Sequence, residues 1–319
     1  MSTLDRHYHH NPPLLGLLLG FTIAILAHSF IPPASSSILP TTSPHGTLSM
    51  STSGNITTVT ISNPPINLYD TFLSADMFSF LSSLNPSNRS TPPPKVVIFR
   101  SADPNFFIAH LDVSSLLLPS TPEKTAFVGQ YVAVTRLLQS LTTTVFIAEI
   151  DGEAFGAGNE LLVQMDMRFA GPKARVGSLE TSIGVTHGAG GMQFLGRLIN
   201  KGRAMQYLLS GDGADCKTGK ELGWFNDCFG SKKEMEDFVE ALAERIALRP
   251  AGALNATKAG LQSMNPPLSV LQADLAAFAP LSVSPEAQLL TKKFLRLGKN
   301  ETRTPFELGL DATLAELFQ

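Results

Sequence analysis

Two glutamates twenty residues apart are the side chains of this sequence best suited to acid–base chemistry. Glu160 follows the glycine-rich stretch FGAGN, and Glu180 follows the stretch ARVGSL. Two carboxylates whose pKa values are pushed apart can divide proton removal and proton delivery between them. Taken alone, each glutamate has a simpler explanation, because a first helical turn favours an acidic residue and a glutamate after a glycine turn is usually solvated.

The stretch before Glu160 predicts a second chemical device, a helix terminus that is open to a ligand. An apolar strand passes through three glycines within residues 152–158 and then begins a helix. The first N–H groups of a helix have no partners within it and carry a positive partial charge, so they can hold an anion or a developing oxyanion. Glycines allow a ligand to approach such a backbone closely.

Dinucleotide binding is an alternative explanation for these glycines, and it fits poorly. GAGNEL begins like the G-x-G-x-x-G fingerprint, and the acidic Glu180 lies twenty residues beyond Glu160. However, Leu161 stands where the third glycine is needed, and Glu180 does not close a long apolar strand.

Turn-forming residues recur from residue 45 onwards, and the segments between them predict the strands and helices that position these glutamates and glycines. We expect two alternating strands that meet at Gly54 and Asn55, then a helix, a buried strand at 95–101, a helix capped by Thr121 and a strand at 144–150. Apolar strands that alternate with helices indicate an α/β protein with a parallel sheet covered on both faces. The apolar face of the first helix is expected to hold Phe72, Met77, Phe80 and Leu84.

Composition excludes several classes of function. A chain of 319 residues that is 43% hydrophobic can fill a sizeable core. Its formal charge is −3, and no basic run alternates with aromatic residues, so we expect no nucleic-acid partner. Cys216 and Cys228 are too few for a zinc site or a disulfide framework, although they could form one disulfide in an oxidising compartment.

The N-terminal segment predicts targeting to a membrane or to the secretory route. Residues 14–31 carry no formal charge, and they are as long as a minimal membrane span. A Pro- and Ser-rich linker follows them. We expect a membrane anchor or a secretory signal peptide. The alternative is a cytosolic or organellar protein whose true start lies downstream of this segment.

An ordered set of motifs resembles the enoyl-CoA hydratase/isomerase (crotonase) family. The similar elements are, in chain order, NFFIAHLDV, DGEAFGAGNEL, DMRFA, Glu180 with Gly184, and the glycines of residues 188–191. They lie within residues 46–250, and the likeness continues more weakly to the C-terminus. The ordered set is far more specific than any one motif.

The resemblance implies an α/β fold of the ClpP/crotonase type, a spiral of β-β-α units with a C-terminal helical region. It divides the chain into a hydrophobic segment with its linker (1–44), a crotonase-like core (45–250) and a helical region (251–319). It also implies an acyl-CoA thioester as the substrate, no cofactor apart from the coenzyme A of that substrate, no metal, and assembly as a homotrimer or hexamer.

By position, the resemblance also implies roles for individual residues. Glu160 corresponds to the glutamate that activates water, and Glu180 to the one that protonates the α-carbon of the substrate. The N–H groups of Ala109 and Ala157 correspond to the oxyanion hole that holds the thioester oxygen. The residues expected to bind substrate are His110, Leu111, Asp112, Gly156 and Gly158.

Three residues depart from the family pattern. His110 stands where a glycine is usual, Ala157 replaces the central glycine of G-G-G, and His187 replaces a common proline. We expect both histidines to make polar loop contacts, and His110 is the better candidate for a functional one because it adjoins the thioester. The predicted reaction is hydration of a 2-enoyl-CoA. The alternatives are an enoyl-CoA isomerase and a non-catalytic secreted or membrane-tethered relative.

Overall fold

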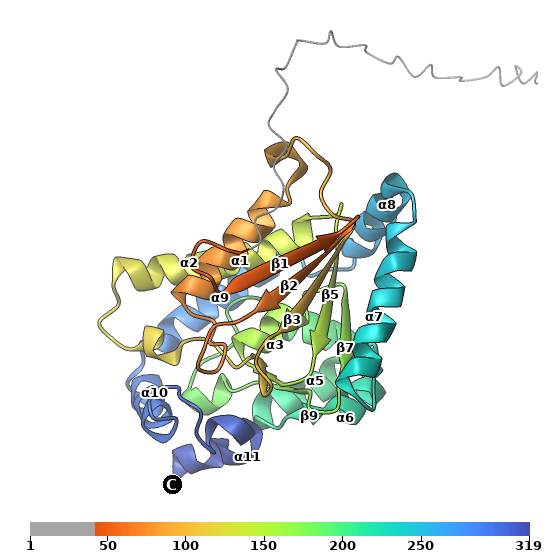
Figure 1. Ribbon diagram of the computed structural model, residues 1–319. Helices are drawn as coiled ribbons and strands as arrows, with labels where there is room; N and C mark the ends of the chain where they lie inside the picture. Colours follow the sequence, from red (N-terminus) through yellow and green to blue (C-terminus); the bar gives the residue numbers. More distant parts are fainter. Residues whose placement is uncertain (1–41) are drawn as a thin grey trace, which may run out of the picture. The chain divides into compact units, whose positions relative to one another are not determined.

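The structure is a computed structural model that describes residues 42–319, and two sheets form its frame (Figure 1). The larger sheet has the strand order β1-β2-β3-β5-β7-β10, and the smaller has the order β4-β6-β8-β9. The strands of the larger sheet are β1 (Leu48–Ser53), β2 (Ile56–Ile61), β3 (Val96–Ser101), β5 (Val145–Ile150), β7 (Met167–Ala170) and β10 (Asp227–Cys228). Those of the smaller sheet are β4 (Phe106–Ile108), β6 (Glu153–Phe155), β8 (Arg175–Gly177) and β9 (Ala214–Asp215).

The chain alternates between the two sheets, and this gives it the predicted spiral course. β3, β5 and β7 are parallel neighbours in the larger sheet. The strands that follow each of them, β4, β6 and β8, are parallel neighbours in the smaller sheet. Because the carboxyl ends of parallel neighbours meet at one edge of a sheet, the segments that follow β4, β6 and β8 come together.

Helices surround this frame and dominate the chain after residue 190, and they include the helical region expected at 251–319. The α-helices are α1 (Thr71–Ser83), α2 (Pro122–Ser140), α3 (Ala157–Leu162), α4 (Gly191–Leu198), α5 (Lys201–Ser210), α6 (Cys216–Leu222), α7 (Lys232–Ala247), α8 (Ala251–Gln262), α9 (Leu268–Ser282), α10 (Pro285–Leu297) and α11 (Leu310–Thr313). The 3₁₀ turns are η1 (Pro86–Asn88), η2 (Val113–Leu116), η3 (Thr181–Ile183), η4 (Glu307–Gly309) and η5 (Leu314–Phe318).

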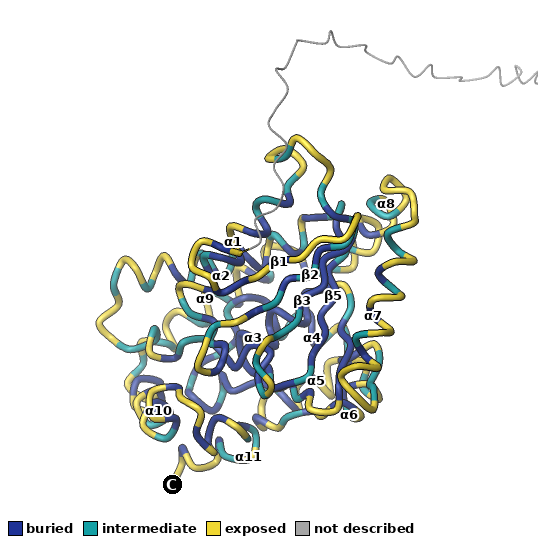
Figure 2. The backbone as a smooth tube through the Cα atoms, viewed as in Figure 1, coloured by how far each residue is buried: buried dark blue, intermediate teal, exposed yellow. Residues whose placement is uncertain are grey.

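Both faces of the larger sheet are covered, which confirms the sequence prediction. Val97 and Phe99 of β3 belong to the core that α1 and α2 help to form. Val96 and Ile98 of the same strand pack instead with Met235 and other side chains of α7. Successive side chains of a strand point to opposite faces, so one apolar strand serves both layers. Figure 2 shows β3 and β5 largely buried between the more exposed helices.

The two helices predicted in the first half of the chain are present with their caps. Asp70 caps α1, and Thr121 caps α2 by accepting a hydrogen bond from the N–H of Lys124 at 3.3 Å. One assignment on α1 is wrong, because Phe72 is 55% exposed. Leu73, the next residue in the chain, lies on the buried stripe of the helix and takes the place of Phe72 in the core.

The predicted membrane or signal segment, residues 14–31, lies outside the described residues. Within residues 42–319, no helix has the length and apolarity that a membrane span requires.

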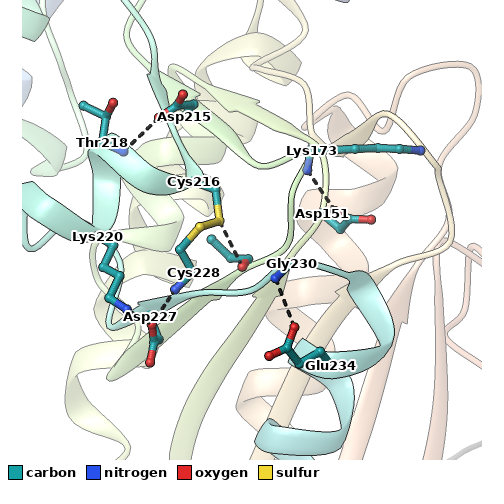
Figure 3. The surroundings of a disulfide bond; sticks show 11 residues. Asp151, Lys173, Asp215, Cys216, Thr218, Lys220, Asp227, Cys228, Gly230 and Glu234 are labelled. Carbon is teal, nitrogen blue, oxygen red and sulfur yellow. Dashed lines mark hydrogen bonds and ion pairs between the residues drawn. A yellow bond between two sulfur atoms is a disulfide. The ribbon is translucent and has the colours of Figure 1, made fainter.

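A disulfide joins Cys216 at the start of α6 to Cys228 of β10 (Figure 3). The sequence left this pairing open. The Cα atoms of the two cysteines lie 5.3 Å apart, within the range that a disulfide spans. The bond closes the α6 segment onto β10, which pairs with β7 at the edge of the larger sheet.

Reduction of this disulfide should destabilise the protein without unfolding it at neutral pH and room temperature. Closing a loop of this size in the unfolded chain contributes about 3 kcal/mol to the free energy of unfolding. Urea unfolding with and without dithiothreitol measures the effect. The double variant Cys216→Ser/Cys228→Ser is the control, since its stability should not respond to dithiothreitol. If the native protein shows two thiols that react with a thiol reagent before reduction, the disulfide is absent.

Candidate active site

A cavity with about 60 Å³ of free space lies where the segments after β4, β6 and β8 meet. Leu111 follows β4, Ala157 and Glu160 follow β6, and Glu180 follows β8. The remaining wall is mostly apolar and comes largely from α2, η3 and α9. It includes Val128, Tyr131, Val132, Ile183, Leu275 and Phe278. The parallel arrangement of the smaller sheet therefore brings both predicted glutamates to one cavity.

A close contact between backbones aligns two of these segments. Gly158 lies in the first turn of α3, and a Cβ atom at this position would lie 2.2 Å from the carbonyl oxygen of Ile108. Only glycine allows α3 to begin so close to the end of β4. Gly156 precedes the helix with a φ of 49°, a conformation that side chains rarely adopt. Gly156 lines the cavity, whereas Gly158 serves packing.

Glu160 is buried and is anchored through one of its two carboxylate oxygens. Its Oε1 accepts hydrogen bonds from the N–H groups of Ala189 at 3.1 Å and Gly191 at 2.9 Å. Its Oε2 lies 3.5 Å from the hydroxyl of Tyr131, which also donates to the carbonyl of Ala157 at 2.9 Å. Burial raises the pKa of Glu160 to about 7, against the lowering effect of His187 and the two N–H groups.

Glu180 is buried as well, but it has a cationic partner. Its Oε2 accepts a hydrogen bond from the N–H of Leu179 at 2.9 Å and lies 3.2 Å from Nε2 of His187. Burial alone would raise the pKa of Glu180, but the charge and hydrogen bond of His187 outweigh burial and lower it. Burial opposes protonation of His187 too, yet Glu180 raises the pKa of this histidine to about 9.

One of the two predicted oxyanion-hole residues has to be corrected. The N–H of Ala109 donates to the carbonyl of Asn67 at 3.2 Å, and Ala109 does not line the cavity. Its N–H is therefore committed to the backbone. Leu111 and Ala157 do line the cavity, and within residues 42–319 neither of their N–H groups has a hydrogen-bond partner. Both N–H groups are therefore backbone donors that the cavity offers.

The other residues expected to bind substrate differ in their positions. His110 lines the cavity, but both of its ring nitrogens are engaged: Nδ1 lies 2.7 Å from the carbonyl oxygen of Leu111 and Nε2 lies 2.9 Å from Oε2 of Glu307. Asp112 does not line the cavity. Its carboxylate accepts a hydrogen bond from the N–H of Ser114 at 3.0 Å and so caps η2.

The C-terminal segment holds the loop after β4 from outside the cavity, which the sequence did not predict. Glu301 accepts a hydrogen bond from the N–H of Val113 at 2.6 Å, and Glu307 pairs with His110. Burial would lower the pKa of His110, but Glu307 and Glu301 raise it to about 9. Arg303 binds Asp103 before β4. No local signal marks these contacts, because their partners lie almost 200 residues away in the sequence.

A second, larger cavity of about 640 Å³ lies between α4, α7 and α8. Neither glutamate lines it, and its two buried cations are engaged: Lys258 binds Asp166 at 2.7 Å, and Arg168 donates to the carbonyl groups of Trp224 and Met165. Among the described residues, no cluster of three His, Cys, Asp or Glu side chains is suited to hold a metal. The cavity with the two glutamates is therefore the candidate active site.

Comparisons with known proteins agree on one family. The sequence model described as "Enoyl-CoA hydratase/isomerase" matches residues 51–290. The human mitochondrial methylglutaconyl-CoA hydratase is 31% identical over 162 residues, which cover 51% of this chain and 48% of that protein. The 2,3-dehydroadipyl-CoA hydratase of Escherichia coli is 36% identical over 130 residues, which cover 41% of this chain and 50% of that protein. The chain thus spans about half the length of these curated relatives.

Solved structures support the predicted fold. A crystal structure from Streptomyces avermitilis, described as that of an enoyl-CoA hydratase, is 31% identical to this chain and has a TM-score of 0.78. The match covers 87% of this chain and 99% of that chain. The crotonase-like α/β fold predicted from the sequence is confirmed.

The predicted location in a membrane or the secretory route is wrong by these comparisons. The human relative is named as a mitochondrial enzyme. The physical reason for the error is that an apolar run of minimal length satisfies the requirement for a membrane span and also occurs in other segments.

The buried pair of His110 and Glu307 should make stability fall at alkaline pH. The pKa of His110 is about 9 in the folded protein and near 6.5 in the unfolded chain, so the pair stabilises fully below about pH 6.5 and its contribution is lost as pH rises through about 9. His187 adds a loss of the same sign. In Glu307→Gln the free energy of unfolding should therefore fall less steeply between about pH 7 and 10.

Urea unfolding at several pH values measures this slope. Glu286→Gln, at an exposed position of α10, is the matched control and should keep the slope of the unchanged protein. An equal slope in Glu307→Gln would show that the pair does not contribute.

Proposed function

Because the chain belongs to the enoyl-CoA hydratase/isomerase family, we propose that it adds water across the double bond of a 2-enoyl-CoA thioester. One observation carries the proposal: two buried glutamates, Glu160 and Glu180, line one apolar cavity, and separate donors hold each of them. Burial of a carboxylate is costly, so two at one small cavity favour a chemical role.

The thioester oxygen is proposed to lie between the N–H groups of Leu111 and Ala157. Both residues line the cavity, and both N–H groups are unengaged among the described residues. Ala157 is the first residue of α3, so its N–H also carries the positive end of a short helix. Each such donor stabilises a developing enolate by about 3 kcal/mol.

Alanine in place of the usual glycine is compatible with this role. The φ of Ala157 is not positive, so the residue adopts an ordinary helical start and keeps its N–H. The replacement of glycine by His110 is compatible as well, because Glu307 and the carbonyl of Leu111 bind its ring. These contacts favour the enzyme over the non-catalytic relative.

The proposed reaction is an addition of water in which the carboxyl groups take opposite parts. One carboxylate takes a proton from water as the hydroxyl oxygen bonds to the β-carbon. The double-bond electrons move toward the thioester oxygen, and the other, protonated carboxyl group delivers its proton to the α-carbon. No further reactant is needed, because the proton taken from water replaces the proton delivered.

The cavity wall supports an uncharged acyl group as the substrate. No Lys or Arg of the described residues lines the cavity, and the cationic ring of His110 is already paired with Glu307. A charged end of an acyl chain would be buried there without a partner, at high cost. A crotonyl thioester is therefore the first substrate to test.

Exposed apolar side chains support the assembly into a homotrimer or hexamer that the resemblance implies. They lie at the end of α7 and around the turn between α8 and α9. They are Leu248, Leu261, Met264 and Leu268, which are 80%, 62%, 70% and 51% exposed. Exposed apolar side chains of this size often mark a protein interface.

Substitution of either glutamate should abolish most of the hydratase activity. Glu160→Gln and Glu180→Gln should each lower kcat for crotonyl-CoA by at least ~10²-fold with little change in affinity for the thioester, because proton transfers act in the transition state. Loss of enoyl absorbance measures the rate. Glu221→Gln, at an exposed position of α6, is the matched control.

The same variants test the alternatives. An isomerase can move one proton with a single carboxylate, so one substitution would be severe and the other mild, measured with a 3-enoyl thioester. Near-normal hydration by the double Gln variant would contradict any role of the pair.

Removal of one oxyanion donor should lower activity while α3 persists. Ala157→Pro deletes the N–H at the first helical position, where proline is tolerated. We expect kcat to fall by about 10²-fold or more. Ala157→Gly keeps the N–H and serves as the control. Equal activity of the Pro and Gly variants, with unchanged circular dichroism, would exclude this donor.

A further inference from the structure

The N–H of Leu111, one of the two proposed oxyanion donors, is oriented by the backbone of its own loop. The carbonyl of His110 accepts a hydrogen bond from the N–H of Tyr69 at 2.8 Å, and the N–H of Asp112 donates to the carbonyl of Tyr69 at 3.1 Å. In a trans peptide the C=O and N–H groups point in opposite directions. Because Tyr69 holds the carbonyl of His110, the N–H of Leu111 points away from Tyr69 and remains available to the cavity.

The side chain of His110 connects this loop to the C-terminal segment. Its Nδ1 lies 2.7 Å from the carbonyl oxygen of Leu111, and its Nε2 lies 2.9 Å from Oε2 of Glu307. The ring is 1% exposed and packs edge-on against Phe294 of α10, with the ring centroids 5.2 Å apart. The ring therefore joins the loop that presents the donor to η4 and α10.

Both ring contacts of His110 require the charged form of histidine. The two partners, the carbonyl of Leu111 and the carboxylate of Glu307, are acceptors, and an imidazolium ring has two N–H donors. A neutral ring has one N–H, so its other nitrogen would present a lone pair to an acceptor. Loss of the proton therefore breaks one of the two contacts.

Carboxyl groups from several parts of the chain surround the ring of His110. Burial would lower the pKa of His110, but Glu307 and Glu301 of the C-terminal segment raise it to about 9. The ring is thus charged throughout the neutral range. The further carboxyl groups that face these two glutamates or line the same cavity are Asp112, Glu153, Glu160 and Glu180.

The C-terminal glutamates depend on the loop in return. Oε1 of Glu307 is buried and has no hydrogen-bond partner among the described residues, so the ring of His110 is the cation that compensates for this carboxylate. Glu301 accepts a hydrogen bond from the N–H of Val113 at 2.6 Å. The loop and the C-terminal segment therefore hold each other in place on both sides of Leu111.

We propose that His110 is a positioning residue that holds the Leu111 donor in place by linking its loop to Glu307, so that the C-terminal segment contributes to stabilisation of the enolate. This inference rests on the proposed function, and it gives a role to a residue that departs from the family pattern. A displacement of about 1 Å at a donor lowers the rate steeply. The loss falls on kcat, because the oxyanion develops only in the transition state.

Two substitutions of Glu307 test the link. Glu307→Leu removes the acceptor for Nε2 of His110, and near pH 7 it should lower kcat for crotonyl-CoA about tenfold with little change in KM. Glu307→Gln should restore kcat, because an amide can accept a hydrogen bond from a charged ring and donate one to a neutral ring. Glu286→Gln, at an exposed position of α10, is the matched control, and circular dichroism checks that each variant is folded.

The pH dependence provides a readout that a general loss of stability would not produce. His187 also has a pKa of about 9, so kcat of each variant is divided by kcat of the unchanged protein, which removes the contribution of His187. Above about pH 9 the unchanged protein should lose the link. The ratio should then rise from about one toward about ten for Glu307→Gln, and from about 0.1 toward one for Glu307→Leu.

A second measurement does not depend on turnover. Acetoacetyl-CoA forms an enolate with its own ultraviolet absorbance, and an oxyanion hole stabilises this enolate in the bound ligand. With protein in excess near pH 8, Glu307→Leu should lower the ratio of bound enolate to bound keto form about tenfold, whereas Glu307→Gln should preserve it.

The outcomes separate this inference from the proposed function. If the unchanged protein hydrates no enoyl thioester, the proposed function fails, and the enolate ratio alone decides the inference. If hydration occurs but the enolate ratio and kcat are equal in Glu307→Leu and the unchanged protein, the proposed function stands and the inference fails. If Glu307→Leu does not fold, Glu307→Gln decides, and a kcat ratio that stays at one above pH 9 overturns the inference.

Discussion

Two carboxylates in one apolar cavity are the constraint on which the rest of this site depends. Each would lose favourable hydration on burial and would repel the other, so each needs its own compensation. A single loop provides most of it. The ring of His187 pairs with Glu180, and the N–H groups of Ala189 and Gly191 bind Glu160. Because neighbouring residues of one short loop bind both carboxylates, the covalent structure of that loop limits how far the two carboxylates can move relative to one another.

Glycines allow the backbone to come this close to the carboxylates. A Cβ atom on Gly191 would lie 2.3 Å from Cγ of Glu160, so only glycine can donate its N–H at this distance. Gly158 meets the same limit against Ile108. The C-terminal segment completes the arrangement from outside, where Glu301, Arg303 and Glu307 hold the two ends of β4 and the loop that follows. Residues 299–301 of this segment adopt consecutive left-handed backbone conformations. The contacts of the segment compensate for the strain of these conformations.

Much of the frame could be predicted because its signals are local. Apolar strands, the Thr121 cap of α2, and the glycine turn before α3 each depend on neighbouring residues. The exposed Phe72 was misassigned because an apolar side chain near the start of a helix can satisfy the periodicity without reaching the core. Periodicity could not predict the smaller sheet, because its strands of two or three residues are too short to show an alternating hydrophobic pattern.

The sequence by itself determined which side chains could act: Glu160 and Glu180, with a helix start beside the first. It also determined the fold class, through the order of strands, helices and glycine turns. Only the tertiary structure decided that the N–H of Ala109 donates to Asn67, that the N–H of Leu111 has no partner among the described residues, and that His187 pairs with Glu180. The physical reason is range. Helices and strands arise from contacts between close neighbours in the chain, whereas the availability of a donor and the charge of a buried carboxyl group depend on partners brought there by folding.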